Sequence, residues 1–144
     1  MEKLMKLDKE YASWITELAK RYRSSQIKAA TKVNDEMLQF YWSIGEDIEK
    51  RQMENRYGSH FYENVSRDLK KALALNRGLS PTTIKYTHYF YRLYCQLLEN
   101  RQQDIDDFGG IFKIPWSLHV LIIDKVKNDP HKALFFVKKT LENN

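Results

Sequence analysis

The sequence contains little cysteine, glycine or proline, and each shortage excludes a class of protein. Its 144 residues include one cysteine, Cys95, so the chain can form neither an internal disulfide nor a cysteine-built zinc site. Five glycines and three prolines are too few for frequent turns, which favours long uninterrupted elements. The chain also lacks a signal-peptide core and any apolar run near the ~18 residues of a membrane span. We therefore expect a cytoplasmic protein that has no membrane partner.

The residues that are present favour one globular domain. Hydrophobic residues make up 42% of the chain and charged residues 30%, a balance that excludes a disordered tail. A chain of this length buries one core of ordinary size, so we expect a single domain over residues 1–144. The net charge of +5 is mild, but it is unevenly placed. Residues 61–92 carry six basic and two acidic groups, for a local charge of +4, and this is where a polyanionic partner would bind.

Apolar residues recur at steps of three and four, which predicts helices, and alternation typical of strands is nearly absent. Three helix-start signals stand out: Asp8, Ser80 before Pro81, and Asp129 before Pro130. We expect one helix that begins at Asp8 and a second from Ile27 to Ile48, with a break at Ser24–Ser25 between them. A third begins near Ser59, and a fourth runs from Ser80 through Leu98 to a polar loop over residues 100–110. Two more helices begin at Pro115 and at Asp129. The prediction is an all-α, multi-helix fold with at most one short β-hairpin.

The long helix from Ile27 to Ile48 has two features of its own. Gly45 lies inside it, where glycine costs about 1 kcal/mol relative to alanine, and a closely packed partner would explain the missing side chain. Its apolar stripe is also close to a heptad pattern, which is typical of helix pairing. One reading of the function is therefore a protein-interaction or dimerisation module that uses residues 27–48 to form a homodimer.

The sequence offers no support for catalysis, a metal or a cofactor. Its histidines, which lack the i,i+4 pairing of a helical metal site, are interpreted as surface or boundary residues: His60, His88, His119 and His131. Two groups of carboxylates are interpreted as solvated charge: Glu46, Asp47 and Glu49, and Asp104, Asp106 and Asp107. Phosphate-binding loops and nucleophile motifs are absent. We expect neither enzyme activity nor a small-molecule substrate.

The basic region resembles a helix-turn-helix unit, in which the second helix enters the major groove of DNA. Short polar groups in the first turns of that helix would face the bases, and flanking cations would bind phosphates, which dominate affinity. The base-facing group comprises Ser80 at the cap, Thr82, Thr83, Lys85 and Tyr86; the phosphate-binding group comprises Arg67, Lys70, Lys71 and Arg77. An ordinary helical hairpin with a solvated basic face has the same pattern.

A run of aromatic residues follows in the same helix and has two interpretations. Its members are Tyr86, Tyr89, Phe90, Tyr91 and Tyr94. Aromatic side chains stack on unpaired bases. At helical spacing they more often form core with their hydroxyls at the rim, and this second interpretation is favoured.

Several spaced blocks resemble the bacterial YhcG family, catalogued as a domain of unknown function. Val33-Asn34 leading into Tyr41-Trp42-Ser43-Ile44-Gly45 is similar to its "VN…L…YW.IG" signature. The matching blocks that follow in order are Tyr57-Gly58, Val65-Ser66-Arg67-Asp68-Leu69, Gly78-Leu79-Ser80, Phe90-Tyr91, Pro115-Trp116, His119-Val120-Leu121, Asp124-Lys125-Val126 and Leu141-Glu142-Asn143. The resemblance covers roughly residues 10–144.

The resemblance implies a DNA-binding, helix-turn-helix-like module that targets or regulates an attached nuclease of the PD-(D/E)xK type. In the family that nuclease domain follows this region, and its catalytic constellation has no counterpart in the present sequence. One departure falls at the start of the second helix. The family commonly has Arg-Asn-Leu after its "GFS" turn, whereas Pro81-Thr82-Thr83 follows Ser80 here and the nearest cation is Lys85.

Overall fold

In the computed structural model, residues 8–100 and 110–143 are described, and within them the chain forms seven helices and no strand. The side chains of residues 26–33 and 98–100 are outside the description. The helices are α2 (Lys9–Lys50), α3 (Met53–Tyr57), α4 (Phe61–Leu73), α5 (Pro81–Asn100), the 3-10 helix η1 (Gly110–Lys113), α7 (Trp116–Val126) and α8 (Pro130–Glu142). The all-α prediction is confirmed. Of the predicted 100–110 loop, residues 101–109 are outside the description.

The helix-start signals act as predicted. The Asp8 carboxylate accepts hydrogen bonds from the backbone N–H groups of Glu10 and Tyr11, and the Asp129 carboxylate accepts from those of His131 and Lys132. Pro130 occupies the first turn of α8, where its missing N–H is not needed. These local signals position the ends of the helices.

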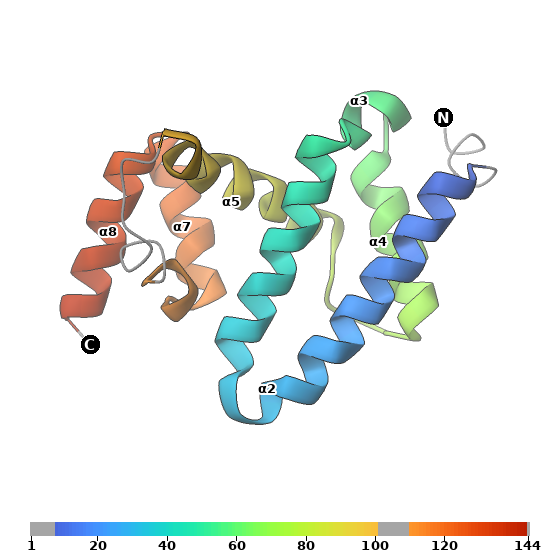
Figure 1. The fold of residues 1–144 in the computed structure, drawn as a ribbon, viewed down its shortest axis with the longest axis horizontal. Helices are drawn as coiled ribbons and strands as arrows, with labels where there is room; N and C mark the ends of the chain where they lie inside the picture. The colour runs from blue at the N-terminus through green and yellow to red at the C-terminus, as the bar shows by residue number, and fades with distance from the viewer. Residues whose placement is uncertain (1–7, 101–109, 144) are drawn as a thin grey trace.

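The α2 helix folds back on itself, and this reversal was not predicted. Its two arms, residues 9–25 and 34–50, lie side by side and antiparallel (Figure 1). Trp14 in the first arm donates from Nε1 to Asp47 Oδ2 in the second arm at 2.7 Å. In a straight helix these two residues would lie about 50 Å apart. Ser24 and Ser25, where a break was predicted, are both helical, so the reversal falls after them.

The apolar stripe of the second arm is buried inside the domain. Phe40, Ile44 and Ile48 are at most 3% exposed and belong to a core with the first arm, α3 and α4. A second core comprises the later half of α5 with η1, α7 and α8. The domain itself therefore covers the described part of the stripe, and the homodimer stays a prediction.

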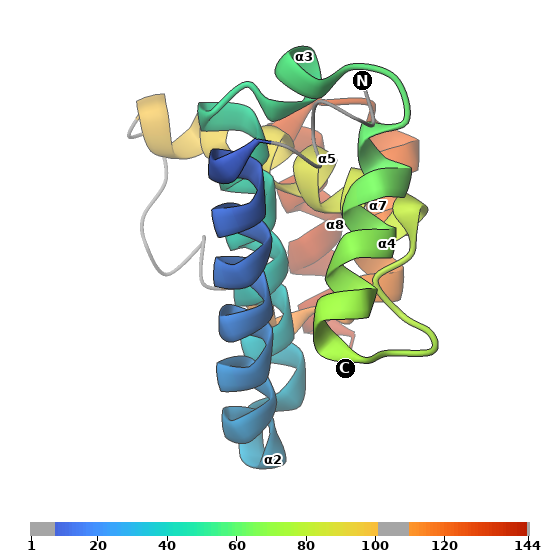
Figure 2. The ribbon, with the colours of Figure 1, turned by 90° about the vertical axis from the view of Figure 1, so that its right-hand side faces the viewer.

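Gly45 lies where α2 crosses α5, and a close partner is present as expected. A Cβ built on Gly45 would lie 2.1 Å from the carbonyl oxygen of Thr87 and 2.8 Å from Cβ of Tyr91. Helix α5 packs more extensively against α2 than against any other element, and Figure 2 shows it crossing behind α2 and α4. The absent side chain allows two backbones to approach each other.

The interpretation of Glu46, Asp47 and Glu49 as solvated charge is wrong for Asp47, which is largely buried and bonded. Its Oδ2 accepts from Trp14 and also lies 2.7 Å from Nη1 of Arg21, and its side chain is only 13% exposed. Sequence alone places Asp47 near charged neighbours on its own helix. Only the reversal of α2 brings Trp14 and Arg21 to it.

We expect Asp47→Ala to lower the free energy of unfolding by about 2 kcal/mol, because the buried Trp14 N–H and the Arg21 guanidinium lose their shared acceptor. Urea denaturation followed by tryptophan fluorescence measures the change. Glu46→Ala is the matched control, since Glu46 only pairs with Lys50 at the surface and should change stability by less than about 0.5 kcal/mol. Equal stability of the two variants would contradict this role for Asp47.

Candidate nucleic-acid interface

The connection between α4 and α5 is anchored to the first core. Helix α4 ends at Ala74, which has a left-handed backbone, and the chain passes through Gly78 at φ +83° before Leu79 at φ +46°. Leu79 is 3% exposed, and its carbonyl accepts a hydrogen bond from the buried Ser66 hydroxyl at 2.7 Å. The connection, residues 74–80, is longer than the three- to four-residue turn of tight helix-turn-helix motifs. It nevertheless holds the start of α5 firmly against α4.

Ser80 caps α5 as predicted. Its Oγ accepts a hydrogen bond from the backbone N–H of Thr83 at 3.1 Å and donates to Thr83 Oγ1 at 3.0 Å. Its carbonyl accepts from the backbone N–H of Ile84. The side chains of Ser80 and Thr83 therefore stabilise the first turn of α5. A contact of either residue with DNA stays a prediction.

The four cations predicted to bind phosphates differ in environment. Lys71 and Arg77 are exposed, at the end of α4 and in the connection. Lys70 is partly buried, and Nε of Arg67 lies 3.0 Å from the Asp68 carboxylate. Asp68 in turn accepts a hydrogen bond from Tyr11 of α2. The structure thus offers Lys71 and Arg77 most openly to a polyanion.

Four side chains form one solvent-facing line along α5, which we call the α5 stripe: Thr82, Lys85, Tyr89 and Arg92. They follow one another at steps of three and four, so they share a helix face. Thr82, Lys85 and Arg92 are exposed, and Tyr89 is partly buried with the ammonium of Lys85 5.8 Å from its ring centre. Arg92 was not predicted as a site residue, and Tyr89 was assigned with the aromatic run to the core, with base stacking as the less favoured interpretation. Their spacing from Lys85 was the available signal.

Tyr86 leaves this line and turns toward α7. Its hydroxyl donates a hydrogen bond to the Asp124 carboxylate at 2.5 Å, and this bond raises the pKa of Tyr86. Phe90, Tyr91 and Tyr94 are buried, which confirms the core interpretation for most of the aromatic run. Tyr86 therefore links two helices, whereas Tyr89 is the member of the run beside the exposed cations.

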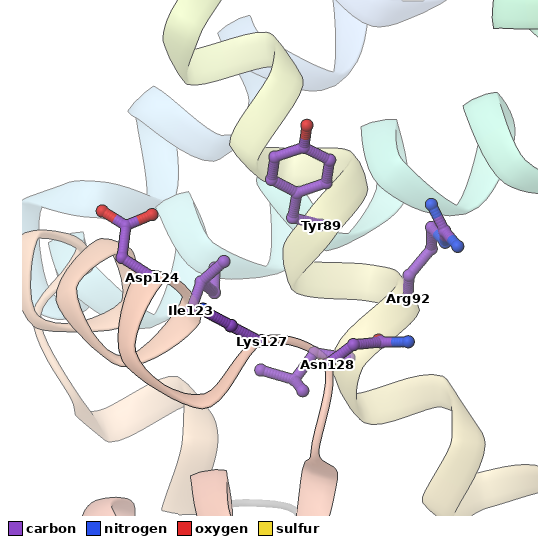
Figure 3. Close-up of a pocket in the computed structure, with 7 residues that line it drawn as sticks. Tyr89, Arg92, Ile123, Asp124, Lys127 and Asn128 are labelled. Carbon is purple, nitrogen blue, oxygen red and sulfur yellow. The ribbon is translucent and has the colours of Figure 1, made fainter.

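A pocket of about 330 Å³ opens beside the second half of the α5 stripe, between α5 and the end of α7 (Figure 3). Its lining comprises Tyr89, Arg92 and Leu93 from α5, Ile123 and Asp124 from α7, and Lys127 and Asn128 from the turn that follows α7. Lys127 and Asn128 both have a positive φ, and Asn128 Oδ1 accepts a hydrogen bond from Gln96 of α5. This volume is within the range of small-ligand sites.

Two histidines are buried, contrary to their interpretation as surface or boundary residues, whereas His60 and His131 are exposed. His88 is 5% exposed; its Nε2 is 2.7 Å from Glu49 Oε1, and its Nδ1 is 3.0 Å from the Tyr62 hydroxyl. His119 is fully buried, and its Nε2 donates to the carbonyl of Ile111 at 2.6 Å. The His119 ring also lies 4.8 Å from the Phe90 ring of α5. Both histidines therefore contact residues that are distant in sequence, which periodicity does not reveal.

Across the described residues, no group of three or more histidine, cysteine or carboxylate side chains is arranged to hold a metal ion. The second predicted carboxylate cluster, Asp104, Asp106 and Asp107, is outside the described residues. The helices that are described include none both long and apolar enough to cross a membrane.

A family model described as the DUF1016 N-terminal domain matches residues 17–144. This is the N-terminal domain of the YhcG family, and the match covers most of the chain. No curated protein and no solved structure shows significant similarity to the sequence.

Proposed function

We propose that this chain, which belongs to the DUF1016 N-terminal domain family, is a non-catalytic DNA-binding module. The observation that carries the proposal is the α4–α5 unit. Its connection is fixed to the core by Ser66 and Leu79, and basic and small polar side chains are exposed at the end of α4, in the connection and in the first turns of α5. The proposed interface comprises Lys71, Arg77, Thr82 and Lys85, with Arg67, Lys70, Ser80 and Thr83 beside them.

The cationic and hydroxyl groups of this interface are the kinds of group that bind the phosphates and base edges of duplex DNA. Lys71 and Arg77 would neutralise phosphates on one side of the groove, and the first turn of α5 would present Thr82 and Lys85 to the base edges. The start of α5 also carries the positive end of the helix dipole, which favours a phosphate nearby. Tyr86 contributes indirectly, because its bond to Asp124 fixes α5 against α7.

A nuclease partner completes the proposal. The family resemblance implies an attached PD-(D/E)xK nuclease domain, and a module that binds DNA without cutting it would bring that domain to its substrate. The competing proposal of dimerisation through residues 27–48 has less support, because the described apolar residues of that stripe are buried in the domain's own core.

We expect the triple variant Lys71→Ala/Arg77→Ala/Lys85→Ala to bind duplex DNA at least about tenfold more weakly than the wild type at low salt. Each lost phosphate contact should reduce the slope of log affinity against log salt by about 0.9. Fluorescence anisotropy at a series of salt concentrations measures both quantities.

The control removes three exposed cations elsewhere: Lys9→Ala/Lys20→Ala/Lys132→Ala. It changes the net charge equally, so it separates a local interface from a general attraction to polyanions. A wild type that does not bind duplex DNA, or two triple variants with equal losses, would overturn the proposed interface.

A further inference from the structure

We infer that the pocket between α5 and α7 accepts the base of an unpaired nucleotide next to the bound duplex, an inference that rests on the proposed DNA binding. The protein would then prefer DNA that carries a single-stranded extension over a blunt duplex. The pocket contains the three kinds of group that such a nucleotide requires: an aromatic ring, an apolar floor and cations at the rim.

The ring and the floor suit a base. Tyr89 is partly buried at the mouth of the pocket, and Leu93 and Ile123 supply apolar surface within it. Stacking of a base on an aromatic side chain inside a pocket requires a base that can leave the duplex stack, and an unpaired nucleotide does so without breaking a base pair. The volume of about 330 Å³ holds a small ligand and excludes a duplex.

The rim suits a phosphate and a polar base edge. Arg92 of α5 and Lys127, which follows α7, bring positive charge to the rim, and Nε of Arg92 also lies 3.8 Å from the partly exposed Glu49 carboxylate. Figure 3 shows Arg92 and Asn128 on the same side of the pocket. The Asn128 amide oxygen accepts from Gln96, which leaves the amide N–H groups to donate to a base. The one carboxylate of the lining, Asp124, accepts a hydrogen bond from Tyr86.

The α5 stripe connects the pocket to the proposed duplex interface. Lys85 belongs to that interface, Tyr89 and Arg92 line the pocket, and all three lie on one helix face. Seven residues of helix separate Lys85 from Arg92, or about 10 Å. A strand that leaves the duplex near Lys85 would therefore reach the pocket within about three nucleotides.

The experiment compares a blunt duplex with the same duplex carrying a short single-stranded extension, by anisotropy at fixed salt. Wild type should bind the extended DNA about tenfold more tightly, from one stacked base and one added phosphate contact. Tyr89→Ala should lose this preference, and Tyr89→Phe, which keeps the ring, should retain it. Both variants should bind the blunt duplex as the wild type does.

Lys127→Gly is a second variant, and it tests the phosphate contact of the pocket without changing the Tyr89 ring. Lys127 has a left-handed backbone at φ +48°, which glycine adopts without strain, so the charge is removed from a domain that stays folded. We expect several-fold weaker binding of the extended DNA only. If the wild type binds both DNAs equally, or Tyr89→Ala keeps the preference, the inference is overturned and the duplex interface stands. If it binds neither DNA, both proposals fail.

Discussion

Replacing Gly45 by alanine is expected to lower the free energy of unfolding by about 3 kcal/mol or more. The added methyl carbon would lie 2.1 Å from the carbonyl oxygen of Thr87, far inside van der Waals contact. That oxygen belongs to the backbone of α5, so it cannot move away as the end of a flexible side chain could. Helices α2 and α5 would have to separate, and the packing on both sides of the crossing would be lost.

The sign of the change in unfolding free energy distinguishes close helix packing at Gly45 from simple helix propensity. Helix propensity alone predicts that alanine at an interior helical position is more stable than glycine by about 1 kcal/mol. Urea denaturation of Gly45→Ala against the wild type distinguishes the two expectations. Ser13→Ala, at an exposed position of the first arm of α2, serves as the control and should change stability by less than about 0.5 kcal/mol. A stabilised Gly45→Ala variant would show that the crossing is looser than described.

Acidification is expected to destabilise the domain by roughly 3 kcal/mol through His119 alone. Burial lowers the pKa of this imidazole from 6.5 to about 4. Between those two pH values the unfolded chain binds a proton that the folded chain does not. The contribution of His119 to stability is therefore complete above pH 6.5, falls as the pH drops, and is lost near pH 4.

The measurement is the free energy of unfolding at a series of pH values between 7.5 and 4 in the wild type and in His119→Gln, which cannot titrate in this range. Carboxylates also contribute at the acid end: hydrogen bonds from Tyr57 and Arg56 lower the pKa values of Asp8 and Glu10. The difference between the two pH profiles isolates His119. His131→Gln, at an exposed site, should follow the wild type. If the stability of His119→Gln fell with decreasing pH as steeply as that of the wild type, the acid sensitivity would not come from His119.

The features that sequence predicts well here depend on neighbouring residues. The caps at Asp8, Ser80 and Asp129 act within one helical turn, and the apolar spacing that defines each helix is equally local. A break was predicted at Ser24–Ser25, but the continuous helix and its antiparallel reversal were not, because no residue between the two arms is a strong helix breaker. The burial of Asp47 and His119 follows from contacts with residues far along the chain, and such contacts leave no periodic signal.

In the candidate interface, too, sequence predicts the local features and misses those that depend on tertiary contacts. The α4–α5 unit and the solvent-exposed Lys71, Arg77, Thr82 and Lys85 could be selected from charge and helix signals. Tyr89 was grouped with core aromatics because of its helical spacing within the run, and the other four members do pack inward or against α7. The pocket depends on α7 lying beside α5, an arrangement that only the tertiary structure reveals.

The residues behind the family resemblance serve the packing of the fold. Asn34 donates to the carbonyls of Phe112 and Ile114, and Tyr41 meets Trp116 edge to face with ring centres 4.7 Å apart. Trp42 contacts Phe90 in the second core, and Gly45 admits α5. Signature blocks that are distant in sequence therefore meet around one crossing. Of the proposed DNA contacts, Arg67 and Ser80 belong to these blocks, whereas Lys71, Arg77, Thr82 and Lys85 lie outside them.

Helix α5 belongs to both cores, since Ile84 is buried in the first and Phe90, Leu93 and Tyr94 in the second. Neither core can dissolve without exposing part of this one helix, so the domain should unfold as a single cooperative unit rather than in two steps. A ligand bound along the outer face of α5 then stabilises both halves at once. Amide hydrogens in α8, which is remote from the proposed duplex interface, should exchange more slowly when DNA is bound, by the same factor as those in α4.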